Sequence, residues 1–268
     1  MQPDGRGGVL LRLENVNKNY ETAAGPVEAV RDISFEVAEG EFVSIVGPSG
    51  CGKSTLMEVV GGLTPASGGE VHIGDRPVTG PDPSIGIVFQ QESAFPWRTV
   101  RENVEFGLEM TGVAADERRT RAEEMIELVG LSGFEDRYPS ELSGGMRQRV
   151  AIGRTLVMKP EIILMDEPFG ALDEQTRLIL GEELSRIRQA TNATILFITH
   201  SFDEALMLSD RIVVMTARPG RLKRMVENPL PRPRDSSILR DPEFARLSGE
   251  LWDALREESM QSMAGERG

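Results

Sequence analysis

Short apolar segments alternate with longer stretches of helical periodicity along most of this chain. Three of these segments are almost entirely apolar, at residues 41–46, 162–165 and 194–199. Such runs are typical of strands buried on both faces, because no face is reserved for water. Strands of this type separated by helical stretches predict an α/β fold with a mainly parallel sheet and crossover helices.

A second kind of segment alternates apolar and polar positions, which is typical of strands with one solvated face. Residues 11–16 and 33–37 have this pattern before the first buried strand, and residues 71–73 have it after that strand. We expect these segments to form an antiparallel β region beside the parallel sheet. A further strand is predicted at residues 222–226.

Helical patterns dominate between about residues 91 and 160. Thr99 and Glu102 fit a capping box, in which the threonine serves the N3 amide and the glutamate reaches back to the cap. Residues 117–129 place apolar side chains on one helical face, at Ala122, Met125, Ile126 and Val129. This stretch is predicted to be a helical subdomain inserted into the α/β domain.

The carboxyl-terminal part has a different character. Residues 217–220 (Ala-Arg-Pro-Gly) predict a turn, and the closely spaced prolines of residues 229–235 predict an extended connector. A terminal helix follows, with one apolar face made by Phe244, Leu247, Leu251 and Leu255. The predicted organisation is one domain at residues 9–230, then a proline-rich connector and helix at residues 231–268.

Composition restricts the location and the partners of the protein. The 268 residues carry a formal net charge of −13 and one cysteine, Cys51, which excludes an internal disulfide. No segment approaches the ~20 consecutive apolar residues of a membrane-spanning helix, and the first residues lack the apolar core of a signal peptide. We therefore expect a cytoplasmic protein, and the acidic charge argues against nucleic acid as a partner.

Residues 47–54 carry the clearest chemical signal, because they match the phosphate-loop pattern G-x-x-x-x-G-K-[ST] directly after a predicted strand. Such a loop points backbone N–H groups at phosphate oxygens, and the following helix adds its positive end. An ordinary glycine turn is the alternative, which the flanking strand and helix disfavour. The predicted nucleotide-binding residues here are Gly47, Pro48, Ser49, Gly50, Cys51, Gly52, Lys53, Ser54 and Thr55.

Particular roles follow within this loop. Lys53 is expected to contact the β- and γ-phosphates of ATP, Ser54 to ligate Mg²⁺, and Thr55 to lie near the α-phosphate. Cys51 precedes a helix N-terminus, where positive potential favours the thiolate and hence a reactive thiol that nucleotide protects. The alternative for Cys51 is a small, buried and unreactive residue.

Asp166 and Glu167 end the second buried strand, so both carboxylates are expected at the C-terminal edge of the sheet, where open α/β sheets bind ligands. Asp166 is predicted to hold Mg²⁺ through water, and Glu167 to polarise the attacking water as general base. Adjacent acids at a strand end are often only solvated. Their combination with a phosphate loop favours the catalytic interpretation.

Residues 142–146 (Leu-Ser-Gly-Gly-Met) lie between the phosphate loop and the acidic strand end. With those motifs they resemble the ATP-binding cassette (ABC) family over about residues 10–230. The resemblance implies a P-loop NTPase core with an antiparallel β region and an inserted helical subdomain. It also implies a head-to-tail dimer formed with a second copy and ATP, in which each signature segment covers the partner copy's γ-phosphate. Ser143, Gly144 and Gly145 begin a predicted helix, so their hydroxyl and N–H groups can face that anion.

The resemblance implies roles for four more residues. Gln90 would coordinate Mg²⁺ or the attacking water, and His200 would contact the γ-phosphate and orient that water. Tyr20 would stack on adenine, unless it is only a partly buried tyrosine at a strand end. Asp173 would bridge the two halves of the dimer. A lone histidine is usually structural or merely exposed, as we expect for His72, but His200 directly follows a buried strand.

Three segments resemble the nitrate/sulfonate/taurine importer branch of the family: residues 94–104, 144–148 and 217–220. Met146 stands where glutamine is more common and leaves the phosphate-facing residues intact. The branch implies a subunit on the inner face of the cell membrane, paired with an integral-membrane permease and indirectly with a solute-binding protein. Phe95, Pro96 and Trp97 would form the groove that receives the permease, and core packing is their alternative interpretation.

Two other functions compete with the importer subunit. A soluble ABC ATPase acting on nucleic acid or ribosomes usually has long coiled coils or a second cassette, and this chain has neither pattern. A phosphotransferase could use the same phosphate loop but would leave the Leu-Ser-Gly-Gly segment without a role. The importer subunit therefore remains the leading hypothesis.

Overall fold

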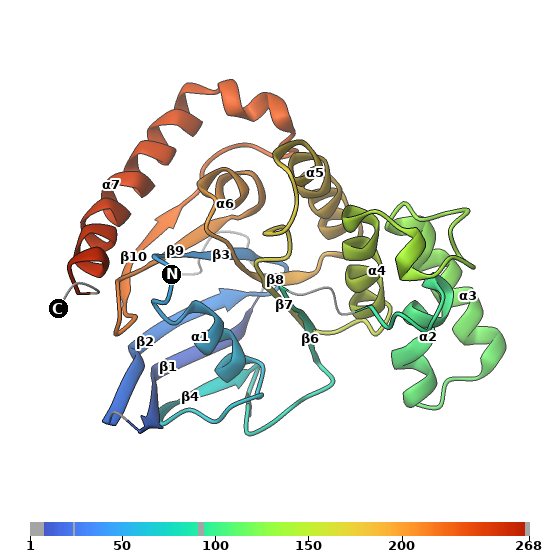
Figure 1. Cartoon of the computed structure of the whole chain (residues 1–268), viewed down its shortest axis with the longest axis horizontal. Helices are drawn as coiled ribbons and strands as arrows, with labels where there is room; N and C mark the ends of the chain where they lie inside the picture. Colours follow the sequence, from blue (N-terminus) through green and yellow to red (C-terminus); the bar gives the residue numbers. More distant parts are fainter. Residues whose placement is uncertain (1–7, 24, 91–93, 266–268) are drawn as a thin grey trace.

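The computed structural model describes residues 8–23, 25–90 and 94–265. Its central sheet has the strand order β10-β9-β3-β8-β7-β6 (Figure 1). The strands are β3 (Phe42–Val46), β6 (Ile85–Val88), β7 (Ile162–Asp166), β8 (Thr194–Ile198), β9 (Arg211–Met215) and β10 (Leu222–Glu227). Only β10 pairs antiparallel, with β9, so the predicted mainly parallel sheet is confirmed for the described residues.

Side chains of the buried strands alternate between two cores, which explains their continuous apolar sequence. In β3, Val43 and Ile45 belong to a core shared with a second sheet, whereas Phe42 and Val46 belong to a core under the helices. Strands β7 and β8 alternate in the same way. A polar side chain at any of these positions would be buried, because both faces of the sheet are covered.

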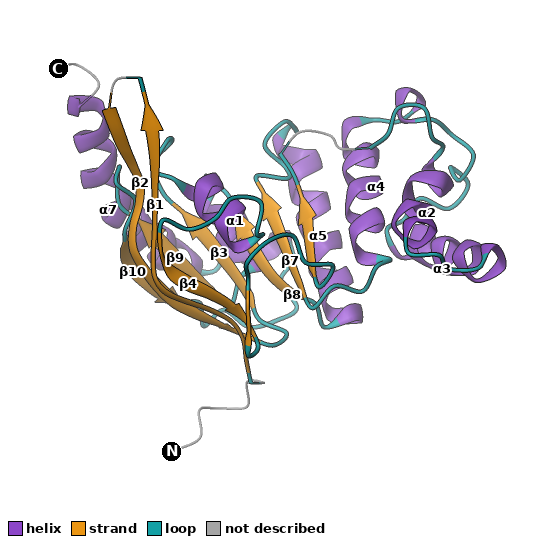
Figure 2. Cartoon of the chain, turned by 90° about the horizontal axis from the view of Figure 1, so that it is seen from below, coloured by secondary structure: helices purple, strands orange, loops and turns teal. Residues whose placement is uncertain are grey.

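The second sheet is antiparallel, in the order β2-β1-β4-β5. Its strands are β1 (Val9–Thr22), β2 (Gly25–Ala38), β4 (Gly68–Ile73) and β5 (Arg76–Pro77). Helix α1 (Lys53–Val60) lies between the two sheets (Figure 2), and its Leu56 and Val60 are fully buried in the core that they share. The predicted antiparallel region is thus confirmed, and it supports the helix that follows the phosphate loop.

The predicted helical subdomain lies beyond the β6 edge of the parallel sheet (Figures 1 and 2). It contains α2 (Val100–Met110), α3 (Ala115–Leu128) and α4 (Gly144–Leu156). The capping box of α2 is confirmed: Thr99 Oγ1 accepts from the Glu102 N–H (3.3 Å), and Glu102 Oε2 accepts from the Thr99 N–H (2.8 Å). Ala122, Ile126 and Val129 are buried, as their predicted apolar face requires.

Three further helices complete the core on the helix-covered face of the parallel sheet. Helices α5 (Glu174–Thr191) and α6 (Phe202–Leu208) pack on the sheet, and α7 (Pro242–Gly265) runs along the outside of α6 (Figure 1). The apolar face of α7 joins the same core as the sheet, through Phe244, Leu247, Leu251 and Leu255. No helix in the described part of the chain is long and apolar enough to cross a membrane.

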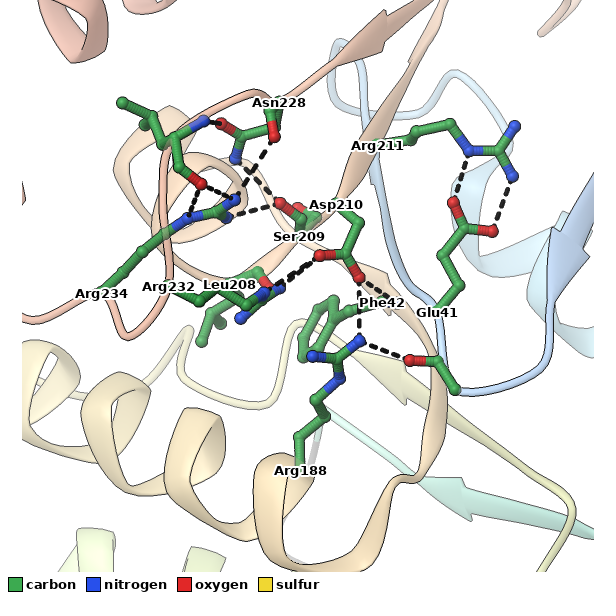
Figure 3. A network of polar contacts seen from close by, with 12 residues as sticks. Glu41, Phe42, Arg188, Leu208, Ser209, Asp210, Arg211, Asn228, Arg232 and Arg234 are labelled. Atoms are coloured by element: carbon green, nitrogen blue, oxygen red, sulfur yellow. Dashed lines mark hydrogen bonds and ion pairs between the residues drawn. The ribbon is translucent and has the colours of Figure 1, made fainter. Parts of the chain in front are cut away.

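The connector before α7 folds back across the starts of β3 and β9 (Figure 3). Asp210, directly before β9, organises this region. Its carboxylate accepts from the Phe42 N–H (2.9 Å), from Arg188 Nη2 (3.1 Å) and from Arg232 Nη2 (2.8 Å). One acidic side chain thereby joins the first strand of the parallel sheet, α5 and the connector.

Arg234 closes the same region from the connector side. Its guanidinium is 4% exposed and donates five hydrogen bonds to backbone carbonyls (Figure 3). These carbonyls belong to Leu206, Ser209, Asn228 and Leu230. Burial lowers the pKa of Arg234 to about 10, so the side chain stays charged at neutral pH. We call Asp210, Arg188, Arg232 and Arg234 the arginine clamp.

Candidate functional site

The phosphate loop turns sharply between β3 and α1, and the turn requires glycine at residue 52. Gly52 has a φ of +101°, and a Cβ there would lie 2.7 Å from the carbonyl oxygen of Ala29. The loop therefore sits directly on strand β2, and a side chain at residue 52 would lift it away. The start of α1 provides the helix N-terminus that the sequence predicted for an anion.

Lys53 is held inside this loop. Its side chain is 6% exposed, and its Nζ donates to the carbonyl oxygens of Gly47 (2.9 Å) and Pro48 (3.0 Å). Lys53 thus brings a positive charge into the phosphate loop of an acidic protein. Phosphate oxygens can replace the two carbonyl oxygens as acceptors for its Nζ. Ser54 is exposed at the first turn of α1, and Thr55 is half-buried beside it.

The expectation of a reactive Cys51 thiolate is wrong for this fold. Cys51 is 1% exposed, and its Sγ packs beneath Gly47, where an added Cβ would lie 2.9 Å away. Burial raises the pKa of the Cys51 thiol, and the nearby Lys53 charge only partly opposes this shift. Desolvation therefore outweighs the positive potential of the helix end, and the alternative interpretation, a small buried residue, holds.

Asp166 ends β7 next to the phosphate loop. Burial raises the pKa of Asp166, and a hydrogen bond from Ser54 opposes the shift. Asp166 Oδ1 is buried without a hydrogen-bond partner among the described residues. A divalent cation, held directly or through water, would satisfy that oxygen and restore the charged carboxylate.

These residues suit Mg²⁺ better than a metal caged by the protein. Mg²⁺ is commonly held by one or two protein groups together with substrate phosphates. The described residues contain no cluster of three or more His, Cys, Asp or Glu side chains that could hold a metal by themselves. Asp166 and Ser54, with nucleotide phosphates, match the first arrangement.

Glu167 lies at the centre of a small polar group at the C-terminal edge of the sheet. Its Oε2 is 3.3 Å from Gln90 Nε2 and 3.3 Å from His200 Nδ1. The three side chains come from the ends of β6, β7 and β8, and the structure brings them together as the sequence predicted. The backbone of Glu167 has a φ of +42°, an uncommon conformation for this residue type.

One buried acid near His200, Glu204, was not predicted from the sequence. Glu204 is buried; it accepts a hydrogen bond from the hydroxyl of Thr199 and forms an ion pair with Arg177 of α5 (3.3 Å). Burial raises the pKa of Glu204. A signal was present in the sequence: Ser201 followed three residues later by Glu204 fits the start of a helix, and Ser201 Oγ accepts from the Glu204 N–H (3.3 Å).

The signature segment forms the beginning of α4. Ser143 is the N-cap, and its Oγ accepts from the Met146 N–H (3.3 Å). Gly145 packs against Thr176, since an added Cβ would lie 3.1 Å from the Thr176 methyl group. Asp173 caps α5 by accepting from the Thr176 N–H (3.0 Å), which lowers the pKa of Asp173. The signature segment and Asp173 therefore meet at adjacent helix starts.

Tyr20 lies near the end of β1 and is partly buried. Its hydroxyl is 3.5 Å from Glu58 of α1, and Lys18 Nζ is 4.9 Å from the centre of its ring. This position suits an aromatic platform beside the phosphate loop as well as simple packing. Stacking of adenine on Tyr20 therefore stays a prediction.

Trp97 is 70% exposed, which rules out the core interpretation for this side chain. Its ring packs on Phe95 with centroids 5.5 Å apart, and Phe95 in turn packs on Phe106 (4.7 Å). The guanidinium of Arg154 lies 4.9 Å from the centre of the Phe95 ring. The surface of Phe95, Trp97 and Phe106 is the aromatic patch. Residues 91–93, which precede it in the sequence, fall outside the described residues.

A phosphate loop, strand-end acids and a histidine at one edge of a parallel sheet define a P-loop nucleoside triphosphatase. The chain belongs to the ABC transporter family, whose model matches residues 30–170. It is 49% identical to an uncharacterised ABC transporter ATP-binding protein of Methanocaldococcus jannaschii, over 95% of this chain and 94% of the relative.

Two further relatives are named as import proteins. The chain is 43% identical to a nitrate import ATP-binding protein of Synechocystis sp., over 92% of this chain and 95% of the relative. It is also 43% identical to an aliphatic sulfonates import ATP-binding protein of Bacillus cereus, over 85% and 90%. The predicted similarity to nitrate and sulfonate importers is confirmed.

A solved structure supports the activity. The fold matches a dimeric ATP-binding cassette in a post-hydrolysis state bound to ADP and Pi, with a TM-score of 0.71 and 35% identity, over 81% of this chain and 98% of that one. The protein is therefore an ATP-binding subunit of an ABC transporter, and it hydrolyses ATP.

Proposed function

We propose that this protein is the ATPase subunit of an importer for a small anion or organic solute of the nitrate, sulfonate or taurine type. The observation that carries the ATPase part of the proposal is the meeting of Gln90 and His200 on one carboxylate oxygen of Glu167, beside the phosphate loop. The nitrate and sulfonate import relatives support the solute class.

In the proposed site, the phosphate loop and Lys53 bind the triphosphate of ATP. Asp166, Ser54 and Gln90 would hold Mg²⁺, which when bound neutralises charge on the phosphates. Glu167 accepts the proton of the attacking water. His200 faces the same carboxylate and can orient that water toward the γ-phosphate. These groups come from the ends of neighbouring strands, which hold them beside one another for the reaction.

The active unit is proposed to be a head-to-tail dimer. Ser143, Gly144 and Gly145 lie in the helical subdomain, whereas α1 lies between the two sheets (Figures 1 and 2). The hydroxyl and free N–H groups at the start of α4 would cover the γ-phosphate bound by a second copy. Asp173 starts the adjacent helix and would bridge the two copies. The dimeric cassette structure supports dimerisation, and the head-to-tail arrangement is our proposal.

A membrane permease is the proposed second partner. In the aromatic patch, exposed Trp97 rests on half-buried Phe95, and the patch gives an apolar surface for a short cytoplasmic helix of that permease. We propose that the protein works on the inner face of the cell membrane, and that a solute-binding protein delivers solute to the permease from the other side.

Co-purification tests this proposal most directly. The tagged protein is recovered from detergent-solubilised membranes of its own host, and a multi-span permease is expected in equal amount. Cells lacking the subunit should also lose uptake of nitrate or of an aliphatic sulfonate. Recovery with nucleic acid or ribosomes and no permease would instead support a soluble ABC ATPase.

A further inference from the structure

The turn at residues 217–220 lies against the phosphate loop, although the two are far apart in sequence. The Gly220 N–H donates to the Ala29 carbonyl (2.9 Å), and the Gly220 carbonyl accepts from the Arg31 N–H (2.9 Å). A Cβ at residue 220 would lie 2.1 Å from the carbonyl oxygen of Cys51, so only glycine allows this approach. The turn, strand β2 and the phosphate loop therefore form one packed unit.

Arg218 extends from this turn to the phosphate loop itself. Its Nε donates a hydrogen bond to the Gly50 carbonyl (3.2 Å). A Cβ placed at Gly50 would meet no atom within 4 Å, so packing on that side does not hold this residue. The N–H of the Gly50–Cys51 peptide donates to the Pro48 carbonyl (3.3 Å), and Arg218 restrains the carbonyl end of the same peptide.

The turn at residues 217–220 is itself held by the last part of α7. Glu258 is 7% exposed, and its carboxylate accepts from the Ala217 N–H (2.9 Å) and from Lys223 Nζ (2.8 Å). Lys223 Nζ also donates to the Ala254 carbonyl (3.0 Å). Removing the Glu258 carboxylate would take this acceptor from both donors, the Ala217 N–H and Lys223 Nζ, which costs free energy at a buried site.

We propose that α7 acts as a brace for the nucleotide site: Glu258 holds the turn, and Arg218 of the turn fixes the orientation of the Gly50–Cys51 peptide. Glu258 and Arg218 are positioning residues that act through the backbone of the phosphate loop. The loop binds phosphate through backbone groups, so its affinity depends on the orientation of each peptide. The C-terminal helix thereby sets the affinity for Mg-ATP. This inference rests on nucleotide binding at the phosphate loop and is independent of the importer role.

The test measures the Kd for Mg-ATP by calorimetry, and KM and kcat for hydrolysis, in the full chain. Arg218→Ala and Glu258→Ala are each expected to weaken Mg-ATP binding about 3- to 10-fold, the range for one lost hydrogen bond. KM should rise in parallel, with kcat at saturating ATP changed less than about twofold. The double variant should bind no more than about twofold worse than Arg218→Ala, because the two residues act in series.

Two further variants separate positioning from stability. Glu250→Ala removes the ion pair of Glu250 with Arg224 of β10 and its pair with Arg246 within α7, but it touches no part of the turn, so its Kd should equal that of the wild type. Glu258→Gln keeps an acceptor for the Ala217 N–H and should lose less affinity than Glu258→Ala.

Two results would overturn the inference. The first is a Glu258→Ala variant that binds Mg-ATP as tightly as Glu250→Ala does. The second is a double variant whose loss is the product of the single losses. If the wild type itself failed to bind Mg-ATP, the nucleotide site would be refuted, and not the brace alone.

Discussion

Trp97 and Trp252 are the two tryptophans of the chain, and both are exposed, at 70% and 60%. Only Trp97 belongs to the aromatic patch proposed to receive the permease. Trp252 lies on α7, where its ring meets Phe202 (6.4 Å between centroids). Trp97→Ala and Trp252→Ala therefore form a matched pair: the same side chain is removed at similar exposure from two surfaces.

The exposure sets the size of the expected effect. A tryptophan buries up to ~250 Å² in a core or an interface, so an exposure of 70% leaves roughly 175 Å² of Trp97 for a partner to cover. At ~25 cal/mol per Å² this is an upper limit of about 4 kcal/mol. Truncation of interface hot spots costs at least ~2 kcal/mol. We expect Trp97→Ala to weaken permease binding by about 2–4 kcal/mol, or roughly 30- to 1000-fold.

The assay uses the permease that co-purifies with the wild-type subunit. Its binding to each variant is measured in detergent, together with the Kd for Mg-ATP and the thermal melting of the isolated subunit. Trp97→Ala should keep ATP affinity and lose permease binding, whereas Trp252→Ala should keep both. Equal permease affinity for the two variants would refute the aromatic patch as the docking surface. So would a loss of ATP binding and folding stability together in Trp97→Ala.

Four further predictions concern the site and the fold. Glu167→Gln should bind ATP, lose about 10²–10⁴ in kcat and accumulate as a dimer; near-normal hydrolysis would remove Glu167 from the role of base. A mixture of Ser143→Arg and Lys53→Ala subunits, each inactive alone, should regain ATPase from the one composite site that stays intact; heterodimers without activity would contradict the head-to-tail arrangement. Cys51 should react slowly with maleimide at neutral pH with or without Mg-ATP, because burial raises its pKa; fast labelling of the native protein would contradict this. Arg234→Met should lower the free energy of unfolding by about 2–5 kcal/mol in denaturant titrations, because buried carbonyls lose their donor; a change below ~0.5 kcal/mol would show that the arginine clamp is not needed for stability.

Sequence reasoning predicted the parallel sheet because its strands are apolar on both faces, a pattern that few other structures produce. The capping box at Thr99 was equally readable, since both hydrogen bonds lie within one helical turn. The family resemblance implied the roles of Gln90 and His200. The structure places both beside Glu167, because the carboxyl ends of parallel strands share one edge.

Features that depend on distant contacts could not be predicted in this way. The sequence motif placed Cys51 near positive charge, but only the packing of its Sγ beneath Gly47 shows that desolvation dominates. The prolines of the connector indicated an extended chain, without indicating that Arg234 would bind the carbonyls at the end of α6. Hydrophobicity alone also gave no means to distinguish an exposed Trp97 from a buried one.

The position of α7 has a consequence for biosynthesis. Four apolar residues of this helix, Phe244, Leu247, Leu251 and Leu255, belong to the same core as strands β3, β7 and β8. A chain that emerges from the ribosome amino end first presents those strands long before their last core partners. The outer surface of α6 therefore stays uncovered until late in translation. Completion of α7 is therefore the step that closes this core.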